Sequence, residues 1–340
     1  MAHNLSLQQL RDREQEQPAP ALPPEPEALN RFIELLPFSP TGAQQRVRVE
    51  IGADLARPKP MLRLVQGDVG SGKTVVAAAA ALQAIAAGYQ VAIMAPTEIL
   101  AEQHLANFSA WFEPLGIDIA WLSGRIKGKA RKATLEKLMG GDTQLVIGTQ
   151  ALFQDDVAFR NLGLVIVDEQ HRFGVHQRLA LTGKAGHGGR PHQLVMTATP
   201  IPRTLSMVAY ADLDCSIIDE LPPGRTPVET VLIDSARRQQ IVARVDAACG
   251  DSRQAYWVCT LIEESDALQA QAAEATAEEL TVALPSHRVG LIHGRLKPAE
   301  KESVMAAFKA GDIDLLVATT VIEVGVDCLL YTSDAADDQG

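Results

Sequence analysis

The stretch Gly67-Asp-Val-Gly-Ser-Gly-Lys-Thr74 decides the fold of this chain. It fits the pattern G-x-x-x-x-G-K-[ST] without a gap, directly after the apolar run 61–66 and before the alanine-rich stretch 73–87. In this pattern glycines let backbone N–H groups curl around phosphate oxygens, and the N-terminus of the following helix adds partial positive charge. A chance glycine turn would not need a strand before it and a helix after it. The stretch therefore predicts a nucleotide-phosphate loop in an α/β domain.

The loop assigns a role to each of its residues. Lys73 is expected to reach the β and γ phosphates, and the Thr74 hydroxyl to ligate Mg²⁺. The remaining N–H groups cradle phosphate oxygens. The predicted nucleotide-binding set is Gly67, Asp68, Val69, Gly70, Ser71, Gly72, Lys73 and Thr74.

A second carboxylate for the metal follows the apolar run 164–167. This run buries a strand and brings Asp168 to its carboxyl end, where Mg²⁺ is expected. Glu169 is then placed to orient or deprotonate an attacking water, and Gln170 and His171 to link the γ-phosphate to neighbouring elements. The alternative is a solvated strand end, but the phosphate loop in the same chain favours the catalytic interpretation.

Apolar runs alternate with longer helical patterns on both sides of these motifs. Six runs predict strands at 61–66, 91–95, 118–123, 144–149, 162–169 and 193–199. They are continuous rather than alternating, as expected for parallel strands that are buried on both faces. A second series predicts strands at 228–233, 254–260, 289–293 and 315–320, with helices at 73–87 and 298–310. The fold class is therefore α/β, with two parallel-sheet lobes.

Proline-rich segments divide the chain. Residues 17–26 hold five prolines, which predicts a leader or linker over 1–35. Residues 221–227 hold three prolines and a glycine, which predicts a hinge. The predicted domains are a first lobe at 36–220 and a partial second lobe at 228–327, followed by a tail at 328–340.

Composition bounds the function classes. The chain has 340 residues, 46% of them hydrophobic and 21% charged, which is ordinary for a soluble globular protein. Its start has no apolar core of the secretory type and its four cysteines show no metal-ligand spacing, so we expect a cytoplasmic protein. The net charge of −11 argues against coating nucleic acid by bulk attraction. Residues 125–132 are the most basic stretch, and a solvated helix face and a DNA-facing surface are equally compatible with them.

Two further motifs make a family resemblance specific. Asp168-Glu-Gln-His171, followed by Thr197-Ala-Thr-Pro200, resembles the motors of superfamily 2 helicases. The stretches APTEILAEQH at 95–104, DEQHRFGV at 168–175 and ATTVIEVGVD at 318–327 narrow the resemblance to the RecG family of ATP-dependent DNA helicases. The match runs from about Leu36 to Asp327. The transcription-repair coupling translocases share this type of motor and are the nearest alternative.

The resemblance implies a P-loop motor of two RecA-like lobes, with ATP and Mg²⁺ as cofactors. It implies remodelling of branched DNA, such as stalled forks and Holliday junctions, in recombination and repair, with forked DNA as partner, no membrane partner and a monomeric state. It assigns nucleotide binding to Phe38, Thr41, Gln44 and Asp327, DNA binding to Thr97, Thr149, Gly294 and Thr320, and coupling of hydrolysis to DNA to Thr197, Thr199, Glu323 and Gly325.

The sequence also departs from the family. The family carries a wedge domain before the motor, of which residues 1–35 can only be the connecting tail. After Asp327 the family continues with an arginine-rich motif, which residues 328–340 do not resemble. We therefore expect a truncated second lobe, a disordered tail and a chain that binds ATP but hydrolyses little of it. A catalytically incomplete ATP-binding module is the alternative to an active motor.

Overall fold

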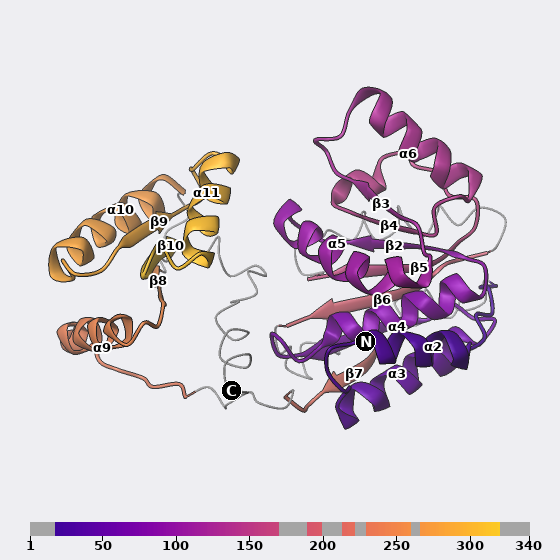
Figure 1. The fold of residues 1–340 in the computed structure, drawn as a ribbon, viewed down its shortest axis with the longest axis horizontal. Coiled ribbons are helices and arrows are strands. Elements are labelled where there is room, and N and C mark those ends of the chain that lie inside the picture. Colours follow the sequence, from indigo (N-terminus) through magenta and orange to yellow (C-terminus); the bar gives the residue numbers. More distant parts are fainter. Residues whose placement is uncertain (1–17, 170–188, 199–212, 222–228, 260–265, 320–340) are drawn as a thin grey trace, which may run out of the picture. The chain divides into compact units, whose positions relative to one another are not determined.

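The computed structural model describes residues 18–169, 189–198, 213–221, 229–259 and 266–319. The chain divides into two compact units, residues 1–223 and 224–340 (Figure 1). Each unit is built on a parallel sheet, so the predicted fold class is confirmed. Residues 328–340, for which disorder was predicted, lie outside the described residues.

The first unit contains a seven-stranded sheet in the order β3-β4-β2-β5-β6-β1-β7. All six strands predicted for this lobe are present, and every strand pair of the sheet is parallel. The seventh strand was not predicted, because its exposed and buried residues alternate at the sheet edge and leave no apolar run. The strands are β1 (Leu62–Gly67), β2 (Gln90–Met94), β3 (Ile119–Leu122), β4 (Leu145–Gly148), β5 (Leu162–Asp168), β6 (His192–Thr197) and β7 (Asp214–Ile218).

Helices cover both faces of this sheet. Val91 and Ile93 point into a core that is closed by α2, α3, α4 and α5, while Ala92 and Met94 point into a second core against α6 and η2. Burial on both faces explains why the strands are continuous apolar runs. The helices are α2 (Pro26–Leu35), α3 (Gly42–Leu55), α4 (Lys73–Ala86), α5 (Glu98–Phe112) and α6 (Gly128–Gly140), with 3₁₀ turns η1 (Glu113–Leu115) and η2 (Gln150–Phe153).

Residues 18–35 pack onto the first unit, so the prediction of a leader or linker over 1–35 is wrong for this part. Leu22 and Phe32 are fully buried, and the Leu22 N–H donates to the Leu55 carbonyl at 2.8 Å. The prolines exclude a helix only before Pro26. Pro26 itself begins α2, where its missing N–H costs nothing.

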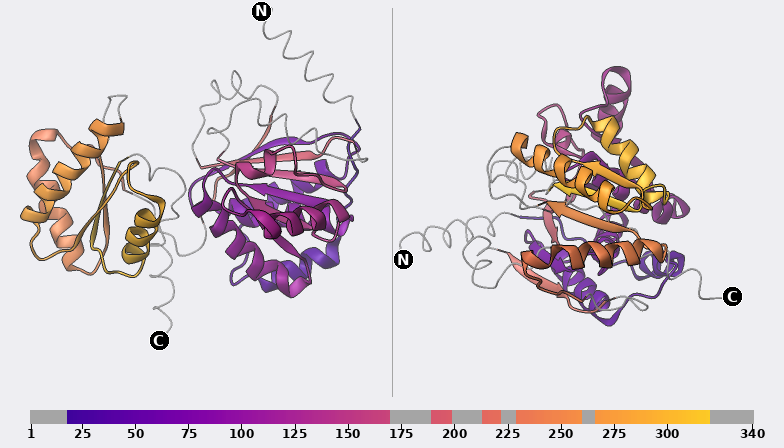
Figure 2. Two further views of the ribbon diagram at one scale, coloured as in Figure 1. Left: turned by 90° about the horizontal axis from the view of Figure 1, so that it is seen from above. Right: turned by 90° about the vertical axis from the view of Figure 1, so that its left-hand side faces the viewer.

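The second unit contains a three-stranded parallel sheet in the order β8-β10-β9. Helices α9 and α10 pack on one face, and α11 packs on the other (Figure 2). None of the described helices is long and apolar enough to cross a membrane. The elements are η5 (Ser235–Arg237), α9 (Arg238–Gly250), β8 (Ala255–Cys259), α10 (Asp266–Ala283), β9 (Val289–Ile292), α11 (Pro298–Lys309) and β10 (Leu315–Thr319).

One predicted strand of this lobe, 228–233, is wrong. Its described residues, 229–233, form no strand, and Leu232 is fully exposed. An apolar run becomes a strand only where a neighbouring strand accepts its hydrogen bonds and a core covers its side chains. The run 228–233 has neither in the described part of the unit.

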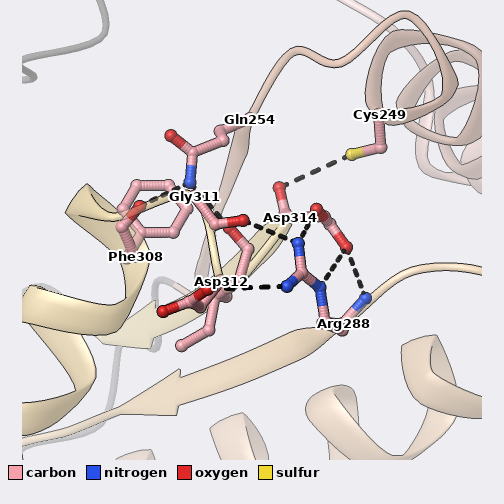
Figure 3. A network of polar contacts seen from close by, with 8 residues as sticks. Cys249, Gln254, Arg288, Phe308, Gly311, Asp312 and Asp314 are labelled. Atoms are coloured by element: carbon pink, nitrogen blue, oxygen red, sulfur yellow. Dashed lines mark hydrogen bonds and ion pairs between the residues drawn. The ribbon is translucent and has the colours of Figure 1, made fainter.

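A polar network fastens the amino end of the second sheet (Figure 3). The Arg288 guanidinium donates to the Asp314 carboxylate at 3.0 Å and to the Gly311 carbonyl at 2.6 Å. The Gln254 amide donates to the carbonyls of Phe308 and Ile313, both at 2.6 Å. The hydrogen bond from the Arg288 side chain also lowers the pKa of Asp314. The network joins the segments that lead into β8, β9 and β10, which leaves the carboxyl ends of these strands at the opposite edge.

Candidate nucleotide site

The phosphate loop lies between β1 and α4, as the sequence predicts. Gly70 and Gly72 have φ angles of 72° and 86°, in the left-handed region that favours glycine. A Cβ atom on Gly72 would also overlap the amide nitrogen of Gln44. The helix N-cap is Gly72, which carries no capping side chain. The first N–H groups of α4 are therefore available to an anion.

Polar groups inside this loop are arranged for exchange with a ligand. The Lys73 ammonium donates to the carbonyls of Gly67 at 2.8 Å and Asp68 at 2.9 Å, so it is folded back over the loop. The Ser71 hydroxyl is buried and has no hydrogen-bond partner in the described part of the chain. A phosphate oxygen would provide a partner for both groups.

Gln44 connects the predicted adenine-binding segment to the phosphate loop. Thr41 caps α3 and forms a capping box with Gln44, whose Oε1 accepts the Thr41 N–H at 3.0 Å. The other end of the same amide donates to the Ser71 carbonyl at 2.8 Å in a buried contact. Phe38 precedes this segment with 45% of its surface exposed, so its ring is accessible for stacking. The structure thus brings Thr41 and Gln44 to the loop.

The two carboxylates leave β5 in different surroundings. Asp168 is 9% exposed, and its Oδ2 lies 2.7 Å from the Nε2 of His104. Glu169 has a φ of 49°, and its carboxylate accepts the Ala198 N–H at 2.9 Å and the Thr197 hydroxyl at 3.1 Å. Glu169 is thereby joined to the segment that follows β6.

Strand order places these groups at one edge of the sheet. β6 lies between β5 and β1, and all three are parallel, so the ends that carry Asp168, Thr197 and the phosphate loop face the same side. Ligands of open α/β sheets bind outside the carboxyl ends of the strands. The Thr74 hydroxyl and the Asp168 carboxylate are oxygen ligands of the kind that Mg²⁺ prefers. The residues therefore fit a magnesium-bound nucleotide.

His104 is a site residue that the sequence did not predict. It lies at helical spacing from the buried residues Leu100, Ala101 and Phe108 on the inner face of α5. A polar residue on that otherwise apolar face was the available signal. The signal did not reveal its partner Asp168, which is 64 residues away in the sequence.

Comparisons with known proteins identify the family. The chain matches the DEAD/DEAH box helicase family over residues 46–208 and the helicase conserved C-terminal domain over 240–329. It is 63% identical to the ATP-dependent DNA helicase RecG of Pasteurella multocida and 64% identical to that of Escherichia coli K12, over 96% of this chain and 48% of each relative. A solved structure of RecG bound to a three-way DNA junction is 41% identical, with a TM-score of 0.78 over 95% of this chain and 42% of the other. The chain belongs to the RecG family. It spans about half the length of the curated relatives it matches.

The RecG-family residues predicted to bind DNA follow carboxyl ends of strands. Thr97 comes after β2 and caps α5, with its hydroxyl accepting the Leu100 N–H at 3.3 Å. Thr149 comes after β4, the neighbour of β2, and is the N-cap of η2. In the second unit Gly294 follows β9, and its carbonyl accepts a hydrogen bond from Lys301 at 2.9 Å. The other predicted site residues lie outside the described part of the chain: Gln170, His171, Thr199, Thr320, Glu323, Gly325 and Asp327.

Ion pairs neutralise much of the basic stretch 125–132. Arg125 pairs with Glu98, Arg131 is bidentate to Asp156, and Lys132 lies 3.8 Å from Glu136. Lys127 and Lys129 are exposed, and no acidic partner is found for them among the described residues. These two lysines are therefore the ones available to a phosphate backbone.

Proposed function

We propose that this chain is the motor part of a RecG-type ATP-dependent DNA helicase or translocase. It binds ATP with Mg²⁺ in the first unit and uses hydrolysis to remodel branched DNA, including stalled forks and Holliday junctions. One observation carries the proposal: Glu169 lies at the same sheet edge as the phosphate loop and is hydrogen-bonded to Thr197 and Ala198. The hydrolytic carboxylate is thus joined to the segment that the family resemblance assigns to coupling.

The side chains of the first unit divide the reaction among them. Lys73 exchanges its two carbonyl partners for oxygens of the β and γ phosphates. Thr74 and Asp168 hold Mg²⁺, which neutralises negative charge on the phosphates. Glu169 orients the attacking water and accepts its proton. Gln44 holds the phosphate loop from the side of the adenine-binding segment, where Phe38 and Thr41 lie.

Coupling to DNA follows from the partners of Glu169. A change in the position of this carboxylate during hydrolysis alters its bonds to Thr197 and Ala198. Thr97 and Thr149 offer hydroxyl and N–H groups to the sugar–phosphate backbone, a kind of contact that carries no sequence information. Gly294 and the residues after Thr319 contribute the second unit's contacts to DNA and nucleotide.

The test is ATP hydrolysis on a synthetic fork compared with a linear duplex of the same length. Because the sequence predicts slow turnover, the reaction is followed over hours, and the Lys73→Ala variant provides the blank. We expect hydrolysis that the fork stimulates more than the duplex does and that the variant lacks. ATP binding without DNA-stimulated hydrolysis would favour the nucleotide-binding module, and absence of ATP binding would refute the proposal.

A further inference from the structure

His104 is held rigidly against the carboxylate of Asp168. Its Nε2 lies 2.7 Å from Asp168 Oδ2, and the two side chains are only 6% and 12% exposed. The ring meets the face of Phe108 edge-on, with centroids 6.4 Å apart and an interplanar angle of 71°. Helix α5 and the packing around Phe108 therefore fix the imidazole before any ligand arrives.

The contact leaves half of the Asp168 carboxylate available. An ionised carboxylate only accepts hydrogen bonds, so His104 Nε2 is the donor. Within the described residues the only recorded partner of Asp168 is His104, which occupies Oδ2. A carboxylate at the end of a strand can turn about its side-chain torsions, and a donor that engages one oxygen sets the direction of the other. Oδ1 is the oxygen left for a metal.

We propose that His104 is a positioning residue that orients Asp168 for Mg²⁺ and so raises the affinity of the site for the metal–nucleotide complex. The inference rests on the proposed function. Groups that hydrogen-bond to a metal ligand commonly contribute 10- to 100-fold in metal affinity, by the general rule for such partners. Histidine is not needed as a ligand itself, because its Nε2 is engaged with Asp168 and Mg²⁺ prefers oxygen.

A simpler role must be separated from this one. A buried histidine needs a hydrogen-bond partner, and Asp168 supplies it, so the pair could serve the packing of α5 alone. The two roles differ in what they predict for Mg²⁺. A packing role changes stability and leaves the Mg²⁺ requirement of nucleotide binding unaltered.

The experiment measures equilibrium binding of a fluorescent, non-hydrolysable ATP analogue to the 340-residue chain across a range of Mg²⁺ concentrations. His104→Leu retains apolar volume but cannot donate, and His104→Gln retains a donor. We expect His104→Leu to raise the half-saturating Mg²⁺ concentration about 10- to 100-fold and His104→Gln to raise it much less. Affinity for the analogue in EDTA should be the same for the three proteins.

His287→Ala is the matched control. It removes another histidine–aspartate contact, His287 Nε2 to Asp246 Oδ1 at 2.9 Å, in the second unit. Its Mg²⁺ requirement should equal that of the wild type, and thermal melting establishes that each variant is folded. Should His104→Leu not fold, His104→Asn replaces it, since the shorter amide cannot reach Asp168 from the same backbone position.

Each result has a distinct meaning. Equal Mg²⁺ requirements for the wild type, the non-donor variant and His104→Gln would overturn the inference and leave His104 a packing residue. A wild type whose nucleotide binding does not depend on Mg²⁺, or that binds no nucleotide, would instead contradict the proposed function. A raised requirement in the non-donor variant that His104→Gln restores supports positioning.

Discussion

Replacing Gln44 with alanine should loosen the phosphate loop and the start of α3 together. The side chain is 3% exposed and donates to the Ser71 carbonyl at 2.8 Å, so its loss leaves a buried acceptor unsatisfied, at a cost of about 1–3 kcal/mol. The bond from the Thr41 N–H is half of a capping box, and its loss adds about 0.5–1 kcal/mol. We expect the first unit to lose about 2–4 kcal/mol of stability, and nucleotide affinity to fall about tenfold, or about 1.4 kcal/mol.

Urea unfolding followed by tryptophan fluorescence measures this loss. A Trp257→Phe background removes the only tryptophan of the second unit and leaves Trp111 and Trp121 as reporters of the first. Gln45→Ala is the matched control, because the neighbouring side chain is exposed and donates only to the Pro40 carbonyl, at 3.0 Å. A Gln44→Ala midpoint equal to that of Gln45→Ala would refute the argument that Gln44 supports the loop.

Three further predictions follow from the site and its surroundings. Glu169→Gln should retain Mg²⁺–ATP binding yet lose about 10²–10⁴ in hydrolysis, since an amide can keep both hydrogen bonds of the carboxylate; equal losses of binding and turnover would place Glu169 among the metal ligands. Burial lowers the pKa of His192, so its contribution to stability is full above about pH 6.5 and is lost as the pH falls below that value; a urea midpoint of the first unit that stays constant from pH 7.5 to 5.5 would contradict this. Replacing Lys127 and Lys129 with alanine should lower the salt slope of duplex binding by about 0.9 per phosphate contact, whereas Arg131→Ala should not; equal slopes for all variants would make the stretch a solvated face.

Much of the fold could be predicted because local signals agreed with burial. The strands that lie inside a sheet, such as 162–168, are apolar on both faces and need no knowledge of their neighbours. The strand at 214–218 was missed because an edge strand is buried on one face only. The run 228–233 misled for the opposite reason: it is apolar but has no neighbouring strand in the described residues. Packing of 18–35 also depends on distant groups, such as the Leu55 carbonyl.

The candidate site divides in the same way. The phosphate loop, Asp168 and Glu169 follow from short motifs, because strand ends and helix starts fix their positions. Contacts across the fold could not be predicted. The bond from Gln44 to Ser71 spans 27 residues, and the contact between His104 and Asp168 spans 64. Both depend on how helices pack against the sheet, which no local pattern encodes.

The most direct test of the central claim is equilibrium binding of ATP to the unmodified chain and to Lys73→Ala, each with and without Mg²⁺. The account predicts saturable binding that Mg²⁺ strengthens. It also predicts that the variant loses this binding, because the ammonium that bonds to the Gly67 and Asp68 carbonyls is then missing from the phosphates. Binding by Lys73→Ala with the affinity and Mg²⁺ dependence of the unmodified chain would contradict the assignment of the nucleotide site.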